Sequence, residues 1–159
     1  GRRVAEVAAR WQAREAAVGR EQLKRLAGIV KHRREMAGAY ARHLRSEAPN
    51  VKAPEEPSWA RSNWQSYCVR LPRDVDQRRV MQSMLDKGIS TRRGIMCIHR
   101  EQAYAGLATP WPLAQSEAAQ DEGLILPLFP DMTEEHVQQV VAGLKDALQA
   151  RAPRSQAAE

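Results

Sequence analysis

A proline-free stretch over residues 4–44 constrains the fold of this chain more than any other feature of its sequence. Alanine, arginine, glutamate and glutamine dominate the stretch, and all four residue types favour helix. A long helix is therefore predicted. The phase of the apolar stripe slips across residues 14–22, so we expect a break near Gly19. The apolar side chains that share one helical stripe, at spacings of three, four and seven residues, are Leu23, Leu26, Val30, Ala37, Tyr40 and Leu44.

Beyond this stretch, strand and helix signals alternate. Three prolines in residues 48–57 exclude a continued helix and indicate a connecting loop. Aromatic and β-branched residues then predict a strand at 64–71, and helical spacing after a cap at Asp74 or Asp76 predicts a helix that ends at Gly88. Together these elements indicate an α/β (α+β) domain. The other predicted elements are a strand at 89–91, a turn or two of helix at 101–106, a helix at 113–123, a strand at 124–128, and a helix from Thr133 to Leu148.

The size and composition of the chain limit its class. At 159 residues it has the length of one domain and is short for a two-domain enzyme. It begins with Gly1 rather than Met and shows no signal peptide, so we expect its first residue to be a cut edge of a longer chain. No apolar run approaches the roughly 18 residues that a membrane span needs, and Cys68 and Cys97 lie far apart without metal-spaced partners. We expect a cytoplasmic protein without a membrane span, a disulfide framework or a zinc site.

The net charge of +6 is placed unevenly. Residues 1–45 contain 12 Lys and Arg against 4 Asp and Glu. Such a block can bind nucleic acid, but it is also typical of a solvated helix face or of a surface that meets acidic protein. We do not expect a nucleic-acid partner. A basic helical module that binds nucleic acid or a partner helix remains the alternative interpretation.

The densest polar cluster runs from Thr91 to Arg100, after a predicted strand, where scaffolds often carry functional groups. Arg92 and Arg93 can make bidentate contacts to phosphates or a carboxylate, and His99 can move a proton or bind a hydroxyl near neutral pH. Surface arginines and a satisfied histidine are the plain alternatives. The sequence has no glycine-rich phosphate loop, no metal-spaced cluster and no nucleophile elbow. On these grounds alone it indicates only an α/β domain.

Three stretches, taken in order, resemble the DegT/DnrJ/EryC1/StrS family of sugar aminotransferases. The first is a helix motif, the second joins a strand to a turn, and the third leads from a strand into a helix. Each motif is weak alone, whereas their order and spacing over residues 14–151 are specific. They are AAVGREQLKRL at 16–26 with Arg33, Arg34, Glu35, Met36 and Tyr40; YCVRL at 67–71 with GISTRR at 88–93, His99, Ala103 and Tyr104; and EGLILPLFP at 122–130 with MTEE at 132–135.

The resemblance implies the type I aminotransferase fold, in which a large domain binds pyridoxal 5'-phosphate and a small C-terminal domain follows, assembled as a homodimer. It implies transfer of an amino group from a donor such as glutamate to a nucleotide-linked keto-sugar. In that family a lysine of the large domain holds the cofactor. We therefore expect a C-terminal fragment that alone binds no cofactor and has no catalytic residue. The lysines present, all outside the matching motifs, are Lys24, Lys31, Lys52, Lys87 and Lys145.

By the same resemblance, residues 1–47 are a helical segment that links to the missing large domain, 58–151 are the small C-terminal α/β domain, and 152–159 are a frayed tail. Arg92 and His99 are implied to approach the sugar nucleotide or the mouth of the active site, with Tyr104 as a companion.

Two positions depart from the family pattern. Gln102 stands where the family usually has proline, and of the family's NxRM element, whose Asn reaches the cofactor phosphate of the neighbouring subunit, only Arg10 is kept. We therefore assign no cofactor-binding residue. A relative that keeps the fold but acts as a dehydratase or a sensor is a further alternative, because the position that separates these reactions is missing.

Overall fold

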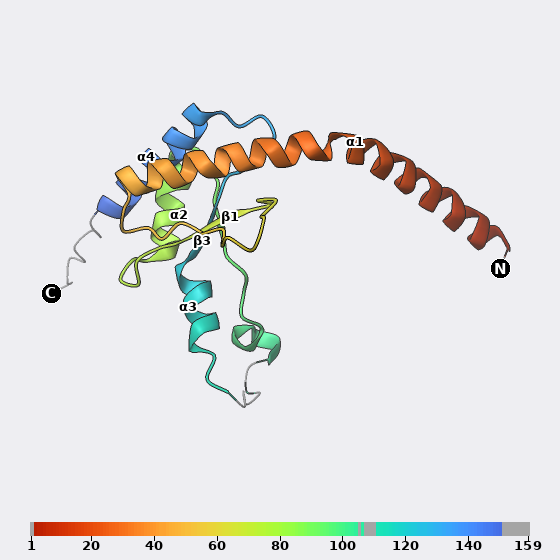
Figure 1. Ribbon diagram of the computed structural model, residues 1–159. Helices are drawn as coiled ribbons and strands as arrows, with labels where there is room; N and C mark the ends of the chain where they lie inside the picture. The colour runs from red at the N-terminus through yellow and green to blue at the C-terminus, as the bar shows by residue number, and fades with distance from the viewer. Residues whose placement is uncertain (1, 105, 107–110, 151–159) are drawn as a thin grey trace.

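A computed structural model describes residues 2–104, 106 and 111–150 of the chain, so the predicted tail at 152–159 lies outside the described residues. Within this described part, four helices, three short strands and two 3-10 turns follow one another (Figure 1). They are α1 (Arg2–Glu47), β1 (Tyr67–Arg70), α2 (Gln77–Asp86), β2 (Arg92–Arg93), η1 (Ile98–Arg100), η2 (Gln102–Tyr104), α3 (Ala114–Glu122), β3 (Gly123–Leu126) and α4 (Glu134–Gln149).

The three strands form one sheet in the order β1-β3-β2, and both outer strands run antiparallel to β3. β1, α2 and β2 therefore form a crossover unit whose two strands are separated by β3. The register pairs Val69 with Leu124 and Leu124 with Arg93. Because side chains alternate along a strand, these three lie on one face of the sheet, and Arg92 lies on the other face with Ile125.

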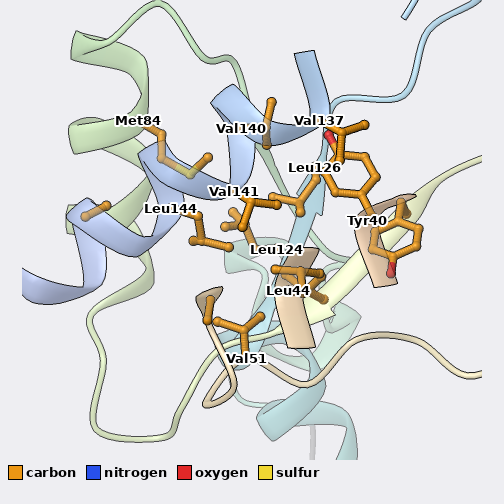
Figure 2. Packing of buried hydrophobic residues seen from close by; sticks show 14 of the residues in the cluster. Tyr40, Leu44, Val51, Met84, Leu124, Leu126, Val137, Val140, Val141 and Leu144 are labelled. Atoms are coloured by element: carbon orange, nitrogen blue, oxygen red, sulfur yellow. The ribbon is translucent and has the colours of Figure 1, made fainter. Parts of the chain in front are cut away.

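The hydrophobic core lies between the first of these sheet faces and α1, α2 and α4. Figure 2 shows side chains from all three helices converging on Leu124 and Leu126 of β3. Tyr40 of α1 stacks on Tyr67 of β1, with ring centroids 4.8 Å apart, and its hydroxyl donates a hydrogen bond to the carbonyl oxygen of Pro127 at 2.8 Å. Burying a large apolar side chain contributes about 1.5–3 kcal/mol, so this cluster is the main source of stability.

The long helix is confirmed, but the predicted break near Gly19 is wrong. α1 continues through both Gly19 and Gly28, and a Cβ at either would meet no atom within 4 Å. Each glycine weakens a helix by about 1 kcal/mol, which the strong helix formers around it offset. The C-terminal part of α1 packs in the core, and its N-terminal part extends beyond the rest of the domain (Figure 1). Along the described residues no helix is both long and apolar enough to cross a membrane.

Two strand predictions need correction. The strand at 64–71 begins only at Tyr67, because Trp64 has a φ of 49°, which a β-strand does not accommodate. The strand at 89–91 lies instead at Arg92–Arg93. Gly88, with a φ of 77°, ends α2 as predicted, and the side chain of Ile89 then lies against Gly143 of α4. Because Ile89 packs against α4, β2 begins only at Arg92.

Side-chain caps set the beginnings of α2 and α4. Asp76, rather than Asp74, caps α2: its Oδ1 accepts hydrogen bonds from the backbone N–H groups of Arg78 and Arg79 at 2.9 and 3.2 Å. Thr133 caps α4 as predicted. His136 completes this capping box, because its Nδ1 accepts from the backbone N–H of Thr133 at 3.1 Å.

The junction of α3 and β3 gives a test of the packing. A Cβ on Gly123 would lie 2.5 Å from the backbone oxygen of Ala119, which cannot move without distorting α3. We expect Gly123→Ala to lower the free energy of unfolding by about 1–3 kcal/mol. Gly19→Ala, the same change on open helix surface, should raise it by about 0.5–1 kcal/mol. Urea denaturation of both variants measures the difference, and shifts of equal sign would contradict the close approach of Gly123 to α3.

Candidate functional site

The loop after β2 is attached to α3 by charged side chains. His99 Nε2 lies 2.9 Å from Glu117 Oε1, and Arg100 donates to Asp121 Oδ1 at 2.7 Å while its second nitrogen lies 3.3 Å from Glu117 Oε2. Glu117 and Asp121 are four residues apart on α3 and therefore share one helical face. The turn η1 is thus held against α3 on that face.

Hydrogen bonds to the backbone complete this attachment. The backbone N–H of Cys97 donates a hydrogen bond to Gln120 Oε1 at 2.5 Å. The buried thiol of Cys97 donates a hydrogen bond to the carbonyl oxygen of Ser116 at 3.2 Å. Gln77 of α2, which is also buried, donates from Nε2 to the carbonyl oxygens of Gln120 and Gly123 at 2.9 and 2.7 Å. These contacts join α2, α3, β3 and the loop into one unit.

The charges of this unit reinforce one another. The hydrogen bond from His99, and then the charge of Arg100, hold the pKa of Glu117 below its ordinary value. The hydrogen bond to Asp121 raises the pKa of Arg100. A carboxylate whose pKa is lowered in the folded state stabilises it at higher pH. The attachment is therefore present at neutral pH and weakens as the pH falls through the lowered pKa of Glu117.

The three predicted site residues lie on three different elements, β2, η1 and η2. Arg92 lies on β2, exposed, on the sheet face away from the core. His99 is bound to Glu117 of α3, and Tyr104 is half-exposed at the end of η2. Among the described residues no hydrogen bond or ion pair joins these three side chains to one another. A substrate role for Arg92, His99 and Tyr104 stays a prediction.

The residues that hold the loop after β2 against α3 were not predicted from the sequence. Glu117, Gln120 and Asp121 occupy positions i, i+3 and i+4 of the predicted helix at 113–123, a spacing that shows they share a face. That signal is present in the sequence, but nothing local tells which basic residues the face meets. Gln77 carries no comparable signal, because a single glutamine in the first turn of a helix is ordinary.

The loop also exposes large apolar side chains. Ile95 is 89% exposed, and Met96, Ile98 and Tyr104 are also exposed. A group of exposed apolar side chains around one loop is typical of a surface that contacts another molecule or another part of the same protein.

The surroundings of the lysines do not suit pyridoxal phosphate. A lysine that forms a Schiff base is usually desolvated or placed next to a cationic group. Lys24, Lys31 and Lys87 instead lie on the surface beside Glu21, Glu35 and Asp146. None of the five lysines is buried. None of the described lysines therefore has the surroundings typical of a Schiff-base lysine, and within the described residues no cluster of His, Cys, Asp or Glu suits a metal ion.

The fold and the match to known sequences define a domain of the aminotransferase class. The chain belongs to the DegT/DnrJ/EryC1/StrS aminotransferase family, whose model it matches over residues 4–145. The family resemblance of the three sequence motifs is thereby confirmed.

Individual relatives support this assignment. The chain is 33% identical to the erythromycin biosynthesis sensory transduction protein EryC1 of Saccharopolyspora erythraea, over 86% of this chain and 37% of that protein. It is 31% identical to the dTDP-4-dehydro-2,3,6-trideoxy-D-glucose 4-aminotransferase of Saccharopolyspora spinosa, over 84% of this chain and 34% of that enzyme. The chain thus spans about a third of the length of these relatives.

A solved structure confirms the fold class. The aminotransferase TlmJ of Streptoalloteichus hindustanus superposes with a TM-score of 0.74 at 27% identity, over 84% of this chain and 35% of that one. The predicted α/β (α+β) fold, a small aminotransferase domain preceded by a long helical segment, is correct.

Proposed function

We propose that this chain is the C-terminal part of a pyridoxal-phosphate-dependent transaminase that aminates a nucleotide-linked keto-sugar. The family match over residues 4–145 carries the proposal. A relative named as a sugar 4-aminotransferase, 31% identical, supports the reaction class. In the whole protein residues 1–47 link to a large domain and 58–151 form the small domain. The enzyme is proposed to be a cytoplasmic homodimer that takes its amino group from a donor such as glutamate.

In this proposal the chain contributes substrate-binding residues from the loop and from β2. Arg92, exposed on the open sheet face, binds the negative charge of the sugar nucleotide with its planar guanidinium. Glu117 orients the ring of His99 through Nε2, which leaves Nδ1 for a sugar hydroxyl. Tyr104 supplies a further hydroxyl near η1. The cofactor, when bound elsewhere in the protein, supplies the electron sink for transamination.

Two exposed apolar surfaces support a larger protein around this chain. Ile95 and Ile98 flank the loop, and Leu23 and Leu26 lie exposed on the protruding half of α1. Exposure of such side chains to water is unfavourable by roughly 25 cal/mol per Å² of apolar area. We propose that both surfaces are covered in the whole enzyme.

The sensor alternative has one observation in its favour. A relative at 33% identity is named as a sensory transduction protein. A family member that binds a sugar nucleotide without transamination is therefore the second candidate. The two candidates differ in whether the whole protein forms a lysine adduct with the cofactor.

The first test is a titration of the purified chain with pyridoxal phosphate. We expect no saturable lysine adduct in the absorbance spectrum, because every described lysine is at least partly exposed and three are beside carboxylates. Borohydride reduction followed by peptide mass mapping measures the same quantity site by site. One lysine labelled stoichiometrically at micromolar cofactor would overturn the proposal for the isolated chain.

The second test expresses the chain together with any coding sequence upstream of Gly1. That longer protein should form a lysine adduct with the cofactor and transaminate a nucleotide-linked keto-sugar. In that enzyme Arg92→Gln should raise KM for the sugar nucleotide about tenfold or more, as expected for loss of a charge-assisted hydrogen bond. Arg45→Gln, which removes an equal charge from the last turn of α1, is the control. An enzyme that binds sugar nucleotide without an adduct would favour the sensor.

A further inference from the structure

A cavity of about 420 Å³ lies between one flank of α2 and the chain at residues 90–93. The core-facing residues of α2 are Gln77, Val80 and Met84. Arg78, Met81 and Leu85, spaced by three, four and seven residues, therefore line the groove from the adjacent flank. The opposite wall is formed by Ser90, Thr91 and Arg93.

The sheet register separates the two neighbouring arginines of β2. Arg93 pairs with Leu124 and lies on the face that the helices cover, whereas Arg92 pairs with Ile125 and lies on the opposite face. Only Arg93 of the two lines the groove. The groove is thus a separate surface from the one that carries Arg92.

The groove has positive charge without a matching carboxylate. The arginines with ion pairs in the described part of the chain are Arg34, Arg42, Arg70, Arg73 and Arg100, so Arg78 and Arg93 have none. The carboxylate that reaches a lining residue belongs to Asp86, and it accepts a hydrogen bond from Gln82 Nε2 at 2.8 Å. Two guanidinium groups therefore face the cavity with their hydrogen-bond donors available.

The α2 wall of the groove also has an apolar surface, formed by Met81 and Leu85. The cavity volume lies within the range typical of small-molecule sites, about 300–1,000 Å³.

We propose that this groove binds a phosphate-bearing small molecule. The phosphate lies between the guanidiniums of Arg78 and Arg93, because planar guanidinium forks match phosphate oxygens. The less polar part of the ligand lies on Met81 and Leu85. Binding in this groove requires neither the cofactor nor transamination, so it is independent of the proposed function.

The test is a titration of the ¹⁵N-labelled chain with inorganic pyrophosphate at low salt, followed by amide chemical shifts. Saturable shifts are expected in α2 and at residues 90–94. Arg93→Gln and Arg78→Gln should each weaken binding about tenfold or more. Arg45→Gln is the control, because it removes the same charge from the last turn of α1, outside the groove. This control should bind as the unchanged chain does.

Equal weakening by all three variants would overturn the proposal, because it would show attraction to the net positive charge alone. Shifts that do not saturate, or that are absent from α2, would overturn it as well. Arg93→Lys keeps the charge but loses the planar fork, so it should also bind more weakly. Uridine diphosphate should bind more tightly than pyrophosphate, and equal affinity would refute the contact of the apolar part with Met81 and Leu85.

Discussion

Leu124→Ala should lower the free energy of unfolding by about 2–5 kcal/mol, which is the range for truncating a fully buried leucine. Leu124 is 0% exposed in the central strand, and side chains from α1, α2 and α4 converge around it (Figure 2). Removing its three outer carbon atoms leaves a cavity at the place where all core elements meet. Small domains have only about 5–15 kcal/mol of stability, so the variant should lose a large share of it.

Leu85→Ala is the matched control, because Leu85 is 55% exposed on the outer flank of α2. The same truncation there should change the free energy of unfolding by less than about 0.5 kcal/mol. Urea denaturation followed by circular dichroism measures the two values. The free energy of unfolding should fall with urea concentration at the same slope in both variants. Equal losses in the two variants would show that the core is not centred on β3.

The second large effect is unfolding at alkaline pH. Burial raises the pKa of Tyr67 to about 12, and burial together with the charge of Tyr67 raises the pKa of Tyr40 further. A phenol in the unfolded chain ionises near pH 10. Above that pH the unfolded state loses protons that the folded state keeps, so stability is full below about pH 10 and falls as the pH rises toward 12. Each tyrosine contributes a slope of about 1.4 kcal/mol per pH unit.

Tyr67→Phe separates this effect from packing. The hydroxyl of Tyr67 is buried and has no partner among the residues that the structure describes, so its removal should leave stability at pH 7 unchanged or slightly higher. The pH midpoint of unfolding, followed by circular dichroism and tyrosinate absorbance, should rise. Tyr104→Phe removes a half-exposed phenol and should leave the midpoint in place. A midpoint that moves with Tyr104 instead of Tyr67 would contradict the stacked tyrosine pair.

Local signals account for the parts of the fold that the sequence predicts. Asp76 and Thr133 cap their helices as expected, and Tyr40 lies on the buried stripe of α1. The errors occur where tertiary contacts decide the backbone. Ile89 has the character of a strand residue but packs against α4, and Trp64 takes a positive φ that propensity does not reveal.

The candidate site is predictable in outline only. Polar density and the family resemblance identify residues 92–100, but they do not identify the surroundings of these residues. The sequence suggests His99 for contact with substrate, and the structure shows that one of its ring nitrogens contacts Glu117, 18 residues further along the chain. Contacts between residues so far apart depend on how α3 packs, which a pattern in one segment does not specify.

The order of strands in the sheet has a consequence for synthesis of the chain. β3 lies between β1 and β2 in space but follows both in sequence, and the two outer strands have no contact with each other in the sheet. On the ribosome, β2 therefore has no partner strand until residues 123–126 have emerged, and β1 has only the hydrogen bonds between Lys52 and Arg70. Helices α1 and α2 can form earlier because their hydrogen bonds are local. During that interval the core side chains of β1, Tyr67 and Val69, lack the strand that they pack beside, and binding by a chaperone would protect the chain from aggregation.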